Sequence, residues 1–464
     1  MASALIGELT ARLGAGAVLP GDTAPYNADA TEARGLRGRA DAVALPATVQ
    51  QVADVVAWCY EHDVAIVPRG GGSGFAGGAV PVDGGVVLSL ERLAAVRAFD
   101  PHLWRMHVEA GVRTAHVQRL ARENGLLFPP DPGAAEQSQI GGNIATNAGG
   151  PHAFKYGTTG AWVTGLEAVV APGEPIAVGG PLRKDVAGYD LRSLLIGSEG
   201  TLGIVTAAWL RLVPAPEAAL PVVAFHPSVA AGCRAVENVV GAGLQAAALE
   251  YLDAGAVQAS AGSFPGAVPE GAGLMVIAEA DGSAAQAATL RAELVEALGE
   301  GALAVHAPES AAEVRELWRW RDGVSIAVTA QRGGKVSEDI VVPLDRLAEA
   351  IDETVAIGAR HDLQTCSWGH AGDGNLHSTF MVAPGDAEEL ARATQAALEL
   401  FELARSLGGS VSGEHGLGLV KGGQLAGQWA PAALALHERV KAAFDPKGLL
   451  NPGKKLARPA TETD

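Results

Sequence analysis

Two short stretches near the C-terminal end of the chain carry side chains that could bind a metal ion. The first, Trp368-Gly-His-Ala-Gly-Asp-Gly-Asn-Leu-His377, holds two histidines in a glycine-rich loop, and the second, Ser412-Gly-Glu-His-Gly-Leu-Gly418, adds Glu414. Two imidazoles and a carboxylate suit a divalent ion such as Zn²⁺, Mn²⁺ or Fe²⁺ and leave coordination positions for a substrate. Histidines in a loop are also often only polar lining. From spacing alone, both interpretations stay open.

A glycine-rich run from Val67 to Val80 points to a different ligand. It holds six glycines between Gly70 and Gly78, and Arg69 adds a positive charge at its edge. Without a Cβ, successive glycines let backbone N–H groups approach a ligand and form a concavity that binds anions. Apolar residues on both sides predict two flanking strands. We therefore predict a phosphate cradle, with a flexible surface loop as the alternative.

The same run contains a match to the dinucleotide fingerprint G-x-G-x-x-G. That fingerprint binds NAD only when the glycines open a helix. Here Pro81 and the pair Gly84-Gly85 follow at once, and a second strand comes next. A helix does not fit, so we reject a Rossmann NAD site and predict a strand, a loop and a second strand.

A third unusual stretch lies between residues 128 and 157. It is too rich in Gly, Asn and Pro for a regular element, and its small residues would let the backbone approach a flat ligand. Asn143, Thr146 and Asn147 offer hydrogen bonds. A long structureless loop is the alternative, although such loops are uncommon in compact domains unless they are functional.

Composition narrows the class of protein. The 464 residues predict about two to four domains, and 48% hydrophobic residues are ample for buried cores. A net charge of −18 argues against a nucleic-acid or anionic-membrane surface. The three cysteines lie far apart, which excludes iron–sulfur ligation within the chain and favours a reducing compartment. We expect neither a signal peptide nor a membrane span.

The elements around these stretches follow from periodicity and caps. Before Pro214 and Pro216, which mark a linker, we predict helices over 3–14, 48–61 (capped by Thr48) and 114–124, with strands over 104–109 and 163–171. After the linker, helices alternate with short strands, which indicates a separate α+β domain. Its predicted helices cover 229–242, 283–298, 309–331, 344–360 and 385–408, and its strands 221–225, 274–279 and 336–342.

Taken together, these stretches resemble the FAD-dependent oxidoreductases of the vanillyl-alcohol-oxidase (PCMH-type) fold. Within that family they resemble the D-2-hydroxyacid dehydrogenases, which act on D-lactate, D-2-hydroxyglutarate or glycolate. The resemblance runs from about Asp41 to Lys455. It implies an α+β fold with a FAD-binding domain of two α+β subdomains (1–215), an α+β substrate or cap domain with an antiparallel sheet (216–440), and a segment that returns to the flavin (441–464).

The resemblance also implies which residues contact FAD. Residues around the pyrophosphate would be Arg69, Gly70, Gly71, Gly72, Ser73 and Gly74. Those along the isoalloxazine and ribityl portion would be Pro130, Asp131, Pro132, Gly133, Gly141, Gly142, Asn143, Thr146, Asn147, Ala148, Tyr156 and Gly157. Glu199, Gly203 and Ile204 would contact the adenosine side, and Asn451 would return from the C-terminus. Covalent members often use a histidine in the cradle. Ser73 stands here, so we expect non-covalent FAD, and His152 is expected to be a surface histidine.

The same resemblance assigns catalytic roles. His415 matches the base that takes the hydroxyl proton while hydride goes to the flavin. His370, His377 and Glu414 match metal ligands, with zinc expected first and Mn or Fe as alternatives. Arg321 matches the arginine that holds the substrate carboxylate, Lys335 a second contact, and Ser325 lies one helical turn after Arg321. Thr379 stands where the family commonly has an asparagine that helps to bind or orient the substrate.

The expected protein is therefore a cytoplasmic flavoenzyme that oxidises a small anionic D-2-hydroxyacid, D-lactate or D-2-hydroxyglutarate, to the 2-oxoacid. Electrons would pass to a quinone, an electron-transfer protein or an iron–sulfur partner. A homodimer and a peripheral position at the inner membrane face stay open. The nearest alternative is a glycolate oxidase subunit that works only with partner chains. More distant alternatives are a metallohydrolase and a non-catalytic binding module.

Overall fold

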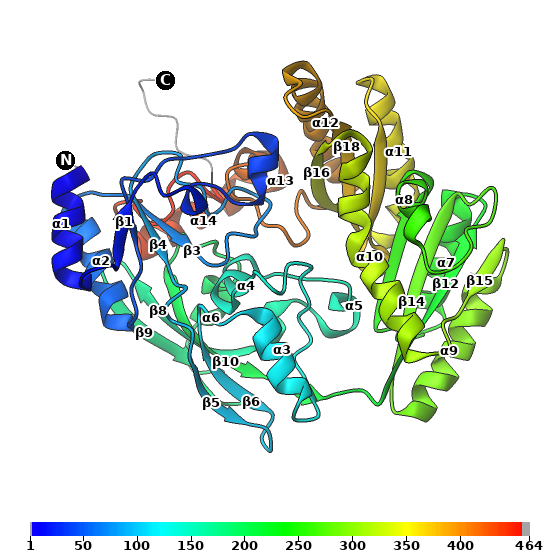
Figure 1. The fold of residues 1–464 in the computed structure, drawn as a ribbon, viewed down its shortest axis with the longest axis horizontal. Coiled ribbons are helices and arrows are strands. Elements are labelled where there is room, and N and C mark those ends of the chain that lie inside the picture. The colour runs from blue at the N-terminus through cyan, green and yellow to red at the C-terminus, as the bar shows by residue number, and fades with distance from the viewer. Residues whose placement is uncertain (1, 457–464) are drawn as a thin grey trace. The chain divides into compact units, whose positions relative to one another are not determined.

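The computed structural model describes residues 2–456, which form two compact units. Of these residues, unit 1 comprises 2–149, 158–215 and 414–456, and unit 2 comprises 150–157 and 216–413. Figure 1 shows the ribbon of both units and labels many of their helices and strands. The elements and sheets are mixed as expected for the α+β class.

Unit 1 begins with a four-stranded sheet that carries the glycine run. Its order is β1 (Val18–Pro20), β2 (Ala42–Ala44), β4 (Val86–Ser89) and β3 (Ile66–Arg69), and β2, β4 and β3 are parallel. Parallel neighbours need a long crossover, which is usually a helix. Between β3 and β4 the glycine run makes that crossover without a helix, so the predicted strand, loop and strand are confirmed.

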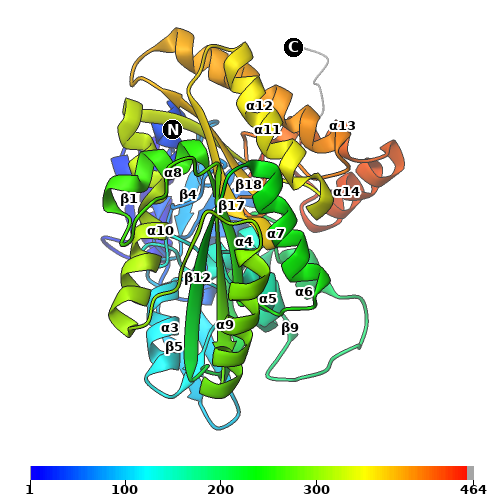
Figure 2. The same cartoon turned by 90° about the vertical axis from the view of Figure 1, so that its right-hand side faces the viewer.

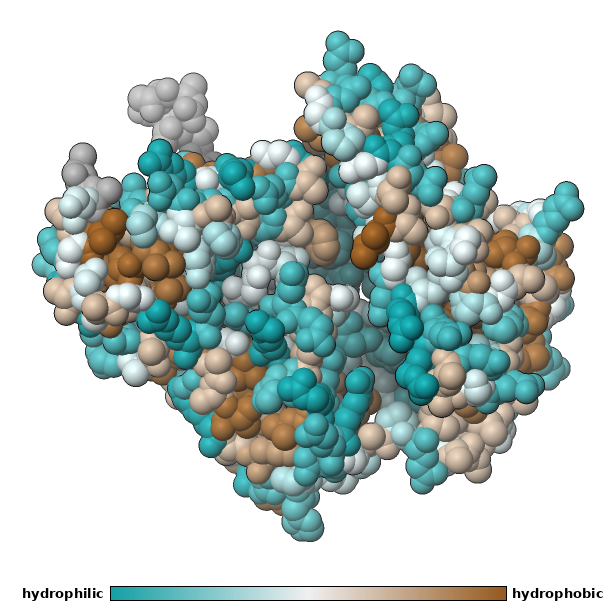
Figure 3. Space-filling model, in the orientation of Figure 1, coloured by the Kyte–Doolittle hydropathy of each residue, from teal (hydrophilic) through white to brown (hydrophobic). Residues whose placement is uncertain are grey.

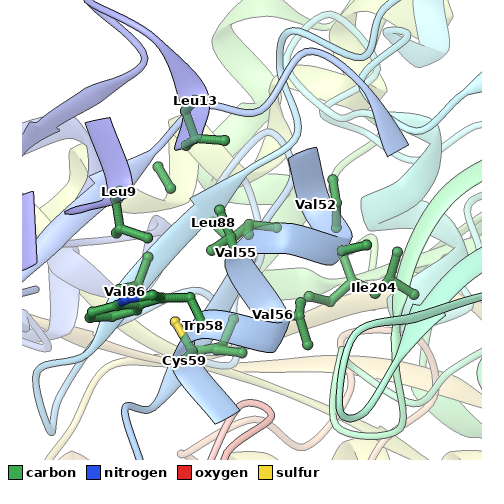
Figure 4. Packing of buried hydrophobic residues seen from close by; sticks show 14 of the residues in the cluster. Leu9, Leu13, Val52, Val55, Val56, Trp58, Cys59, Val86, Leu88 and Ile204 are labelled. Carbon is green, nitrogen blue, oxygen red and sulfur yellow. The ribbon is translucent and has the colours of Figure 1, made fainter. Parts of the chain in front are cut away.

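Helix α2 (Val49–Glu61) makes the other crossover, from β2 to β3. The Thr48 side chain accepts the Gln51 N–H and caps the helix, as predicted. Val52, Val55 and Val56 are fully buried, and Figure 4 shows them between Leu88 on one side and Ile204 on the other. Helix α1 (Ala2–Leu13) closes the same core with Leu9 and Leu13.

A five-stranded antiparallel sheet completes the strand framework of unit 1. Its order is β5 (Val96–Asp100), β6 (Arg105–Glu109), β10 (Ile204–Arg211), β8 (Val163–Val170) and β9 (Glu174–Gly179). A two-stranded sheet joins β7 (Leu126–Leu127) to β11 (Val213–Pro214). The helices of this part are α3 (Thr114–Arg122), α4 (Ile140–Thr146), α6 (Leu191–Leu195), α13 (Leu425–Gln428) and α14 (Pro431–Phe444).

Helix α4 corrects one prediction, because residues 138–150 were expected to lack a regular element. Ile140 and Ile144 are fully buried on one face of this helix, and Asn147 ends it with a left-handed backbone (φ 53°). The two isoleucines stabilise a turn of helix that the surrounding Gly and Asn residues disfavour.

Unit 2 is built on a seven-stranded antiparallel sheet. Its strand order is β15 (Ala304–His306), β12 (Ala218–His226), β14 (Leu274–Gly282), β13 (Ala248–Asp253), β17 (Thr365–His370), β18 (Asn375–Val382) and β16 (Gly334–Val341). An antiparallel sheet in this half of the chain confirms the predicted fold. Figures 1 and 2 show α10 (Ala311–Arg332) and α9 (Ala284–Gly299) on opposite sides of β12.

Each face of this sheet has its own helices. On one face, α10 and α8 (Ala254–Ser260) bury Leu317, Trp320 and Val257 against the strands. The opposite set of helices comprises α7 (Val229–Gly241), α9, α11 (Leu347–Arg360) and α12 (Ala387–Ser406). The α10 face holds the polar residues described below.

The histidine stretch is a hairpin rather than the predicted loop. His370 ends β17 and His377 lies within β18, with a 3₁₀ turn over Ala371–Asp373 between the strands. Glycine, aspartate and asparagine usually indicate loops. The composition of this stretch therefore did not predict its two short strands, which lie in the interior of the sheet. The consequence is a more rigid placement of both histidines than a loop would give.

Two segments lie in a different unit from the one that the predicted domains gave. Residues 414–440 belong to unit 1, because the Leu417 and Gly418 amides bind the Glu199 carboxylate. Residues 150–157 belong to unit 2, because Lys155 and Tyr156 both bind Asp281. The unit also changes between residues 215 and 216, beside the prolines that marked a linker.

The surface drawn in Figure 3 and the lengths of the helices bear on contact with a membrane. Hydrophobic residues on the face drawn in Figure 3 form separate small groups among hydrophilic ones. None of the helices in residues 2–456 is long and apolar enough to cross a bilayer.

Candidate active site

The two histidines predicted as metal ligands lie together on unit 2. His370 and His377 are both buried, and their ring centroids lie 5.3 Å apart. The Asp339 carboxylate accepts the Gly413 N–H at 2.8 Å and so fixes the chain just before Glu414, which follows at the unit boundary. One ligand atom from each of His370, His377 and Glu414 lies within 4.8 Å of the others.

This donor set fits a divalent transition metal. Two imidazoles and one carboxylate are the ligand types of catalytic zinc sites, in which a fourth position stays open for water or substrate. The spacing of the donor atoms is close enough for one ion to reach all three. The residues present therefore fit the group that the sequence suggested.

A buried carboxylate lies behind the first histidine. Glu250 on β13 is fully buried, and its Oε1 lies 2.5 Å from His370 Nδ1. Its Oε2 accepts Arg321 Nε at 2.9 Å and also Arg321 Nη2. Burial alone would raise the Glu250 pKa, but His370 and Arg321 outweigh it and hold the pKa at about 2.

The predicted substrate contacts divide into two groups. Arg321, also buried, is paired with Glu250, whereas Lys335 Nζ donates to Ser325 O at 3.0 Å and to Ser325 Oγ. Lys335 Nζ also lies 5.1 Å from the centroid of the Trp368 ring. Burial lowers the Lys335 pKa to about 8. Thr379 Oγ1 shares a hydrogen bond with Ser337 Oγ at 2.8 Å, on the strand that carries Lys335.

His415 lies in unit 1 and is held by its own loop. Its ring packs 4.9 Å from the Phe75 ring, centroid to centroid, and its Nε2 lies 3.6 Å from Glu414 Oε1. The Glu199 carboxylate binds the amides of the following Leu417 and Gly418. His415 therefore adjoins both a metal-ligand candidate and the tip of the glycine run.

The glycine run has the geometry of a backbone cradle. A Cβ at position 71 would lie 2.1 Å from the Gln137 carbonyl oxygen, and one at position 70 would lie 3.2 Å from Gly142 Cα. Among the described residues, none accepts a hydrogen bond from the N–H groups of residues 71–75. Only glycine fits so close to a second chain segment, and the available N–H groups fit a phosphate-bearing cofactor.

Arg69 has a structural contact that the sequence did not reveal. Its guanidinium donates to the carbonyl oxygens of Ala28 at 2.7 Å and Pro25 at 2.6 Å, and it lies over the Tyr26 ring. Burial lowers its pKa, partly offset by Asp29. Arg69 thus holds residues 25–28 against the cradle. Its direct contact with FAD stays a prediction.

The second predicted flavin stretch is braced by its own polar side chains. Asn143 Nδ2 donates to Thr114 Oγ1 at 2.6 Å, and Asn147 Oδ1 accepts the Gly160 N–H at 2.8 Å. Thr146 Oγ1 donates to the Gly142 carbonyl, and the Pro130 carbonyl accepts Gln118. Contacts of this stretch with FAD stay predictions. Gly141 and Gly142 pack against the neighbouring backbone.

Tyr156 and Gly157 belong to a segment docked on unit 2. Tyr156 donates to Asp281, and burial with this hydrogen bond raises the pKa of its phenol. His152, expected on the surface, is half-buried and its Nε2 lies 2.9 Å from Glu279 Oε1. The same carboxylate accepts Trp318 Nε1 at 2.6 Å. Polar contacts with β14 therefore anchor this segment.

The remaining predicted flavin residues lie in the interior of unit 1. The Ile204 side chain is part of the core around α2, so only its backbone is available to a ligand. Asn451 Nδ2 donates to the carbonyls of Gly78 and Glu199, at 2.9 and 2.8 Å. It thereby ties the C-terminal segment to the glycine run. Gly203 packs against Leu195 and Val170.

Several buried acids on unit 2 were not among the predicted site residues. Glu250, Glu279, Asp281 and Asp339 all lie in strands and are at most 6% exposed. The available signal was a carboxylate inside an otherwise apolar strand, as in Leu249-Glu-Tyr-Leu252 and Ile277-Ala-Glu-Ala-Asp281. A buried carboxylate needs a polar or charged partner, and cationic side chains of unit 2 are found beside these acids.

Comparison with known proteins identifies the family. Residues 215–455 match the family described as FAD linked oxidases, C-terminal domain, and residues 40–179 match the FAD binding domain. This chain belongs to the FAD-linked oxidases. It is a flavoenzyme of the oxidoreductase class, and the cradle described above fits its FAD. This agrees with the resemblance seen in the sequence.

Relatives of this FAD-linked oxidase cover nearly its whole length. "Glycolate oxidase subunit GlcD" of Bacillus subtilis (strain 168) is 36% identical over 94% of this chain and 92% of that protein. "D-2-hydroxyglutarate dehydrogenase" of Xanthomonas citri pv. viticola is 37% identical over 89% and 88%. "D-lactate dehydrogenase" of Archaeoglobus fulgidus is 34% identical over 90% and 91%.

Solved structures show the same fold at low identity. p-Cresol methylhydroxylase with substrate bound superposes with a TM-score of 0.82, with 18% identity over 98% of this chain and 97% of that chain. The agreement confirms the PCMH-type FAD-binding fold of this FAD-linked oxidase.

Proposed function

We propose that this FAD-linked oxidase oxidises a D-2-hydroxyacid, D-lactate or D-2-hydroxyglutarate, to the 2-oxoacid. The observation that carries the proposal is the donor set of His370, His377 and Glu414, followed directly by His415. A 2-hydroxyacid offers a hydroxyl and a carboxylate oxygen, which suit an open metal position. The names of the relatives agree with this class of substrate.

Oxidation of a hydroxyacid removes one proton and one hydride. His415, when neutral, accepts the hydroxyl proton, and the hydride leaves Cα with both electrons. Bound FAD supplies the two-electron acceptor. A divalent metal, zinc first and Mn or Fe as alternatives, would lower the pKa of the substrate hydroxyl. His370, His377 and Glu414 would hold that metal.

The cations of unit 2 bind and orient the substrate in this proposal. Arg321 suits a carboxylate because its planar fork can donate two parallel hydrogen bonds. Lys335 and Ser325 lie together and supply a second polar contact. Two separate cationic positions favour a substrate with a second polar group.

Reoxidation of the flavin requires a separate acceptor, which we propose to be a quinone, an electron-transfer protein or an iron–sulfur partner. The three cysteines are all buried free thiols, which fits a cytoplasmic enzyme. A homodimer remains part of the proposal.

Glycolate oxidation within a multi-chain complex is the second candidate. It is favoured by the 36% identity to a protein named as a glycolate oxidase subunit. Loss of all turnover in the purified single chain, and its recovery with partner chains, would favour this candidate over the first.

The visible spectrum of the purified protein tests both candidates. We expect a yellow protein that is bleached, without oxygen, by D-lactate or D-2-hydroxyglutarate. Bleaching by glycolate alone would replace the first candidate with the second. A yellow protein that none of the three bleaches would overturn the proposed substrate class.

A further inference from the structure

The Glu250 carboxylate contacts a metal-ligand candidate with one oxygen and a substrate-binding candidate with the other. Its Oε1 lies 2.5 Å from His370 Nδ1, and its Oε2 accepts Arg321 Nε at 2.9 Å. All three residues lie within unit 2 and are at most 7% exposed. Glu250 therefore connects two functional groups that come from different elements.

The backbone fixes this arrangement. Strand β13 pairs antiparallel with β17, and Tyr251 and Leu252 oppose Gly369 and Trp368. The same register places Glu250 beside His370 at the end of β17. Arg321 comes from α10, which covers this face of the sheet with Leu317, Trp320 and Val324. A shift of one residue in the pairing would turn Glu250 to the opposite face.

A carboxylate in this position determines which imidazole nitrogen can bind a metal. A hydrogen bond from Nδ1–H to Glu250 fixes the tautomer and presents the lone pair of Nε2 to an ion. Carboxylates behind metal-binding histidines raise the basicity of the ligand and fix the ring orientation. The second oxygen of Glu250 fixes the orientation of the Arg321 guanidinium, because it accepts two of its N–H groups.

We propose that Glu250 is a positioning residue that couples the metal site to recognition of the substrate carboxylate. It orients His370 for metal binding and, through the same buried carboxylate, aims Arg321 at the substrate. This inference rests on the proposed function. It adds that loss of Glu250 weakens metal and substrate binding together, although Glu250 touches neither.

Another buried acid on the same sheet provides the matched control. Glu279 on β14 is 3% exposed and also bridges two partners, His152 and Trp318, but neither is a metal-ligand candidate. Glu250→Gln and Glu279→Gln therefore remove the same charge from equally buried positions. Only the first should affect the metal.

The test measures zinc affinity by competition with a chromogenic chelator on the FAD-loaded protein. We expect Glu250→Gln to weaken zinc binding about 10- to 100-fold, because an amide cannot accept from both His370 and Arg321. Glu279→Gln should keep the wild-type affinity, and Glu250→Asp should restore part of it. The flavin absorbance and melting temperature of each variant check that it is folded.

A third variant separates the effect on metal binding from the effect on substrate binding. Arg321→Met should raise KM for the hydroxyacid while keeping zinc affinity close to wild type, whereas Glu250→Gln should change both. Wild-type zinc affinity in Glu250→Gln, or an equal loss in Glu279→Gln, would overturn the inference. A wild-type protein that binds no zinc would also overturn it.

Failure of the proposed function would be seen separately. If no hydroxyacid bleaches the wild-type flavin, the substrate class is wrong. The zinc measurements would still show whether Glu250 positions His370. If bleaching occurs and zinc affinity is unchanged in Glu250→Gln, the proposed function stands and the inference falls.

Discussion

The carboxylate of Glu199 accepts the backbone N–H of Gly418 at 2.7 Å, although the two residues are far apart in the sequence. The other oxygen accepts Leu417 N–H at 3.0 Å, and the Asn451 amide binds the carbonyl of Glu199. Glu199 has a left-handed backbone (φ 55°), which few non-glycine residues adopt. This buried carboxylate holds the loop that carries His415 in unit 1.

Glu199→Gln should therefore disturb proton abstraction more than substrate binding. The amide group can accept only one of the two N–H groups, and the lost charge-assisted bond should cost about 1–3 kcal/mol of stability. We expect a lower kcat with little change in KM, measured by anaerobic flavin reduction. An equal rise in KM would contradict a role confined to the His415 loop.

Gly71→Ala should prevent FAD binding. The added Cβ would lie 2.1 Å from the backbone carbonyl oxygen of Gln137, which has little room to move. The variant should be purified with little flavin, which the ratio of visible to ultraviolet absorbance measures. Gly78→Ala is the control, because no atom lies within 4 Å of its added Cβ. Full FAD content in Gly71→Ala would argue against the cradle.

Gly372→Ala should distort the turn between the two histidines. Its Cβ would lie 2.5 Å from the Phe154 ring, within unit 2. Overpacking of this kind costs about 1–3 kcal/mol, so we expect a lower melting temperature and weaker zinc binding. Phe154→Ala in the same chain should restore both, because it removes the clash. If Phe154→Ala restores neither the melting temperature nor zinc binding, the effect of Gly372→Ala does not arise from this contact.

Substrate binding should weaken as the pH rises through about 8. Burial lowers the Lys335 pKa from 10.5 to about 8, so its positive charge is lost over this range. KM for the hydroxyacid should rise between pH 7 and 9 in the wild type. Lys335→Met should give a high KM that no longer follows this titration, measured over the same pH range.

The free energy of unfolding should increase as the pH rises, because Lys335 then loses its buried charge. The folded-state pKa lies below the unfolded value, so the unfolded chain binds more protons between about 8 and 10.5. The cost of burying the charged amine is largest below pH 8 and is lost as the pH rises towards 10.5. Lys335→Met should raise the melting temperature most at neutral pH and least near pH 10.

The sequence alone determined the family, the cofactor and the strand–loop–strand form of the cradle. These follow from local requirements. A glycine run without a following helix can bind phosphate only through its own backbone, and Pro81 excludes that helix wherever the run lies in the fold. The histidine, glutamate and arginine positions were likewise recognisable from short motifs.

Only the tertiary structure decided which side chains hold those motifs in place. Glu250 reaches His370 because two antiparallel strands pair in one register, and no local pattern encodes that register. Arg69 turns its guanidinium to the carbonyls of residues 25 and 28, a contact that depends on a distant loop. Buried charges must find partners wherever the fold provides them. The chemistry of this protein is thus visible in its motifs, whereas the positioning of that chemistry depends on long-range packing.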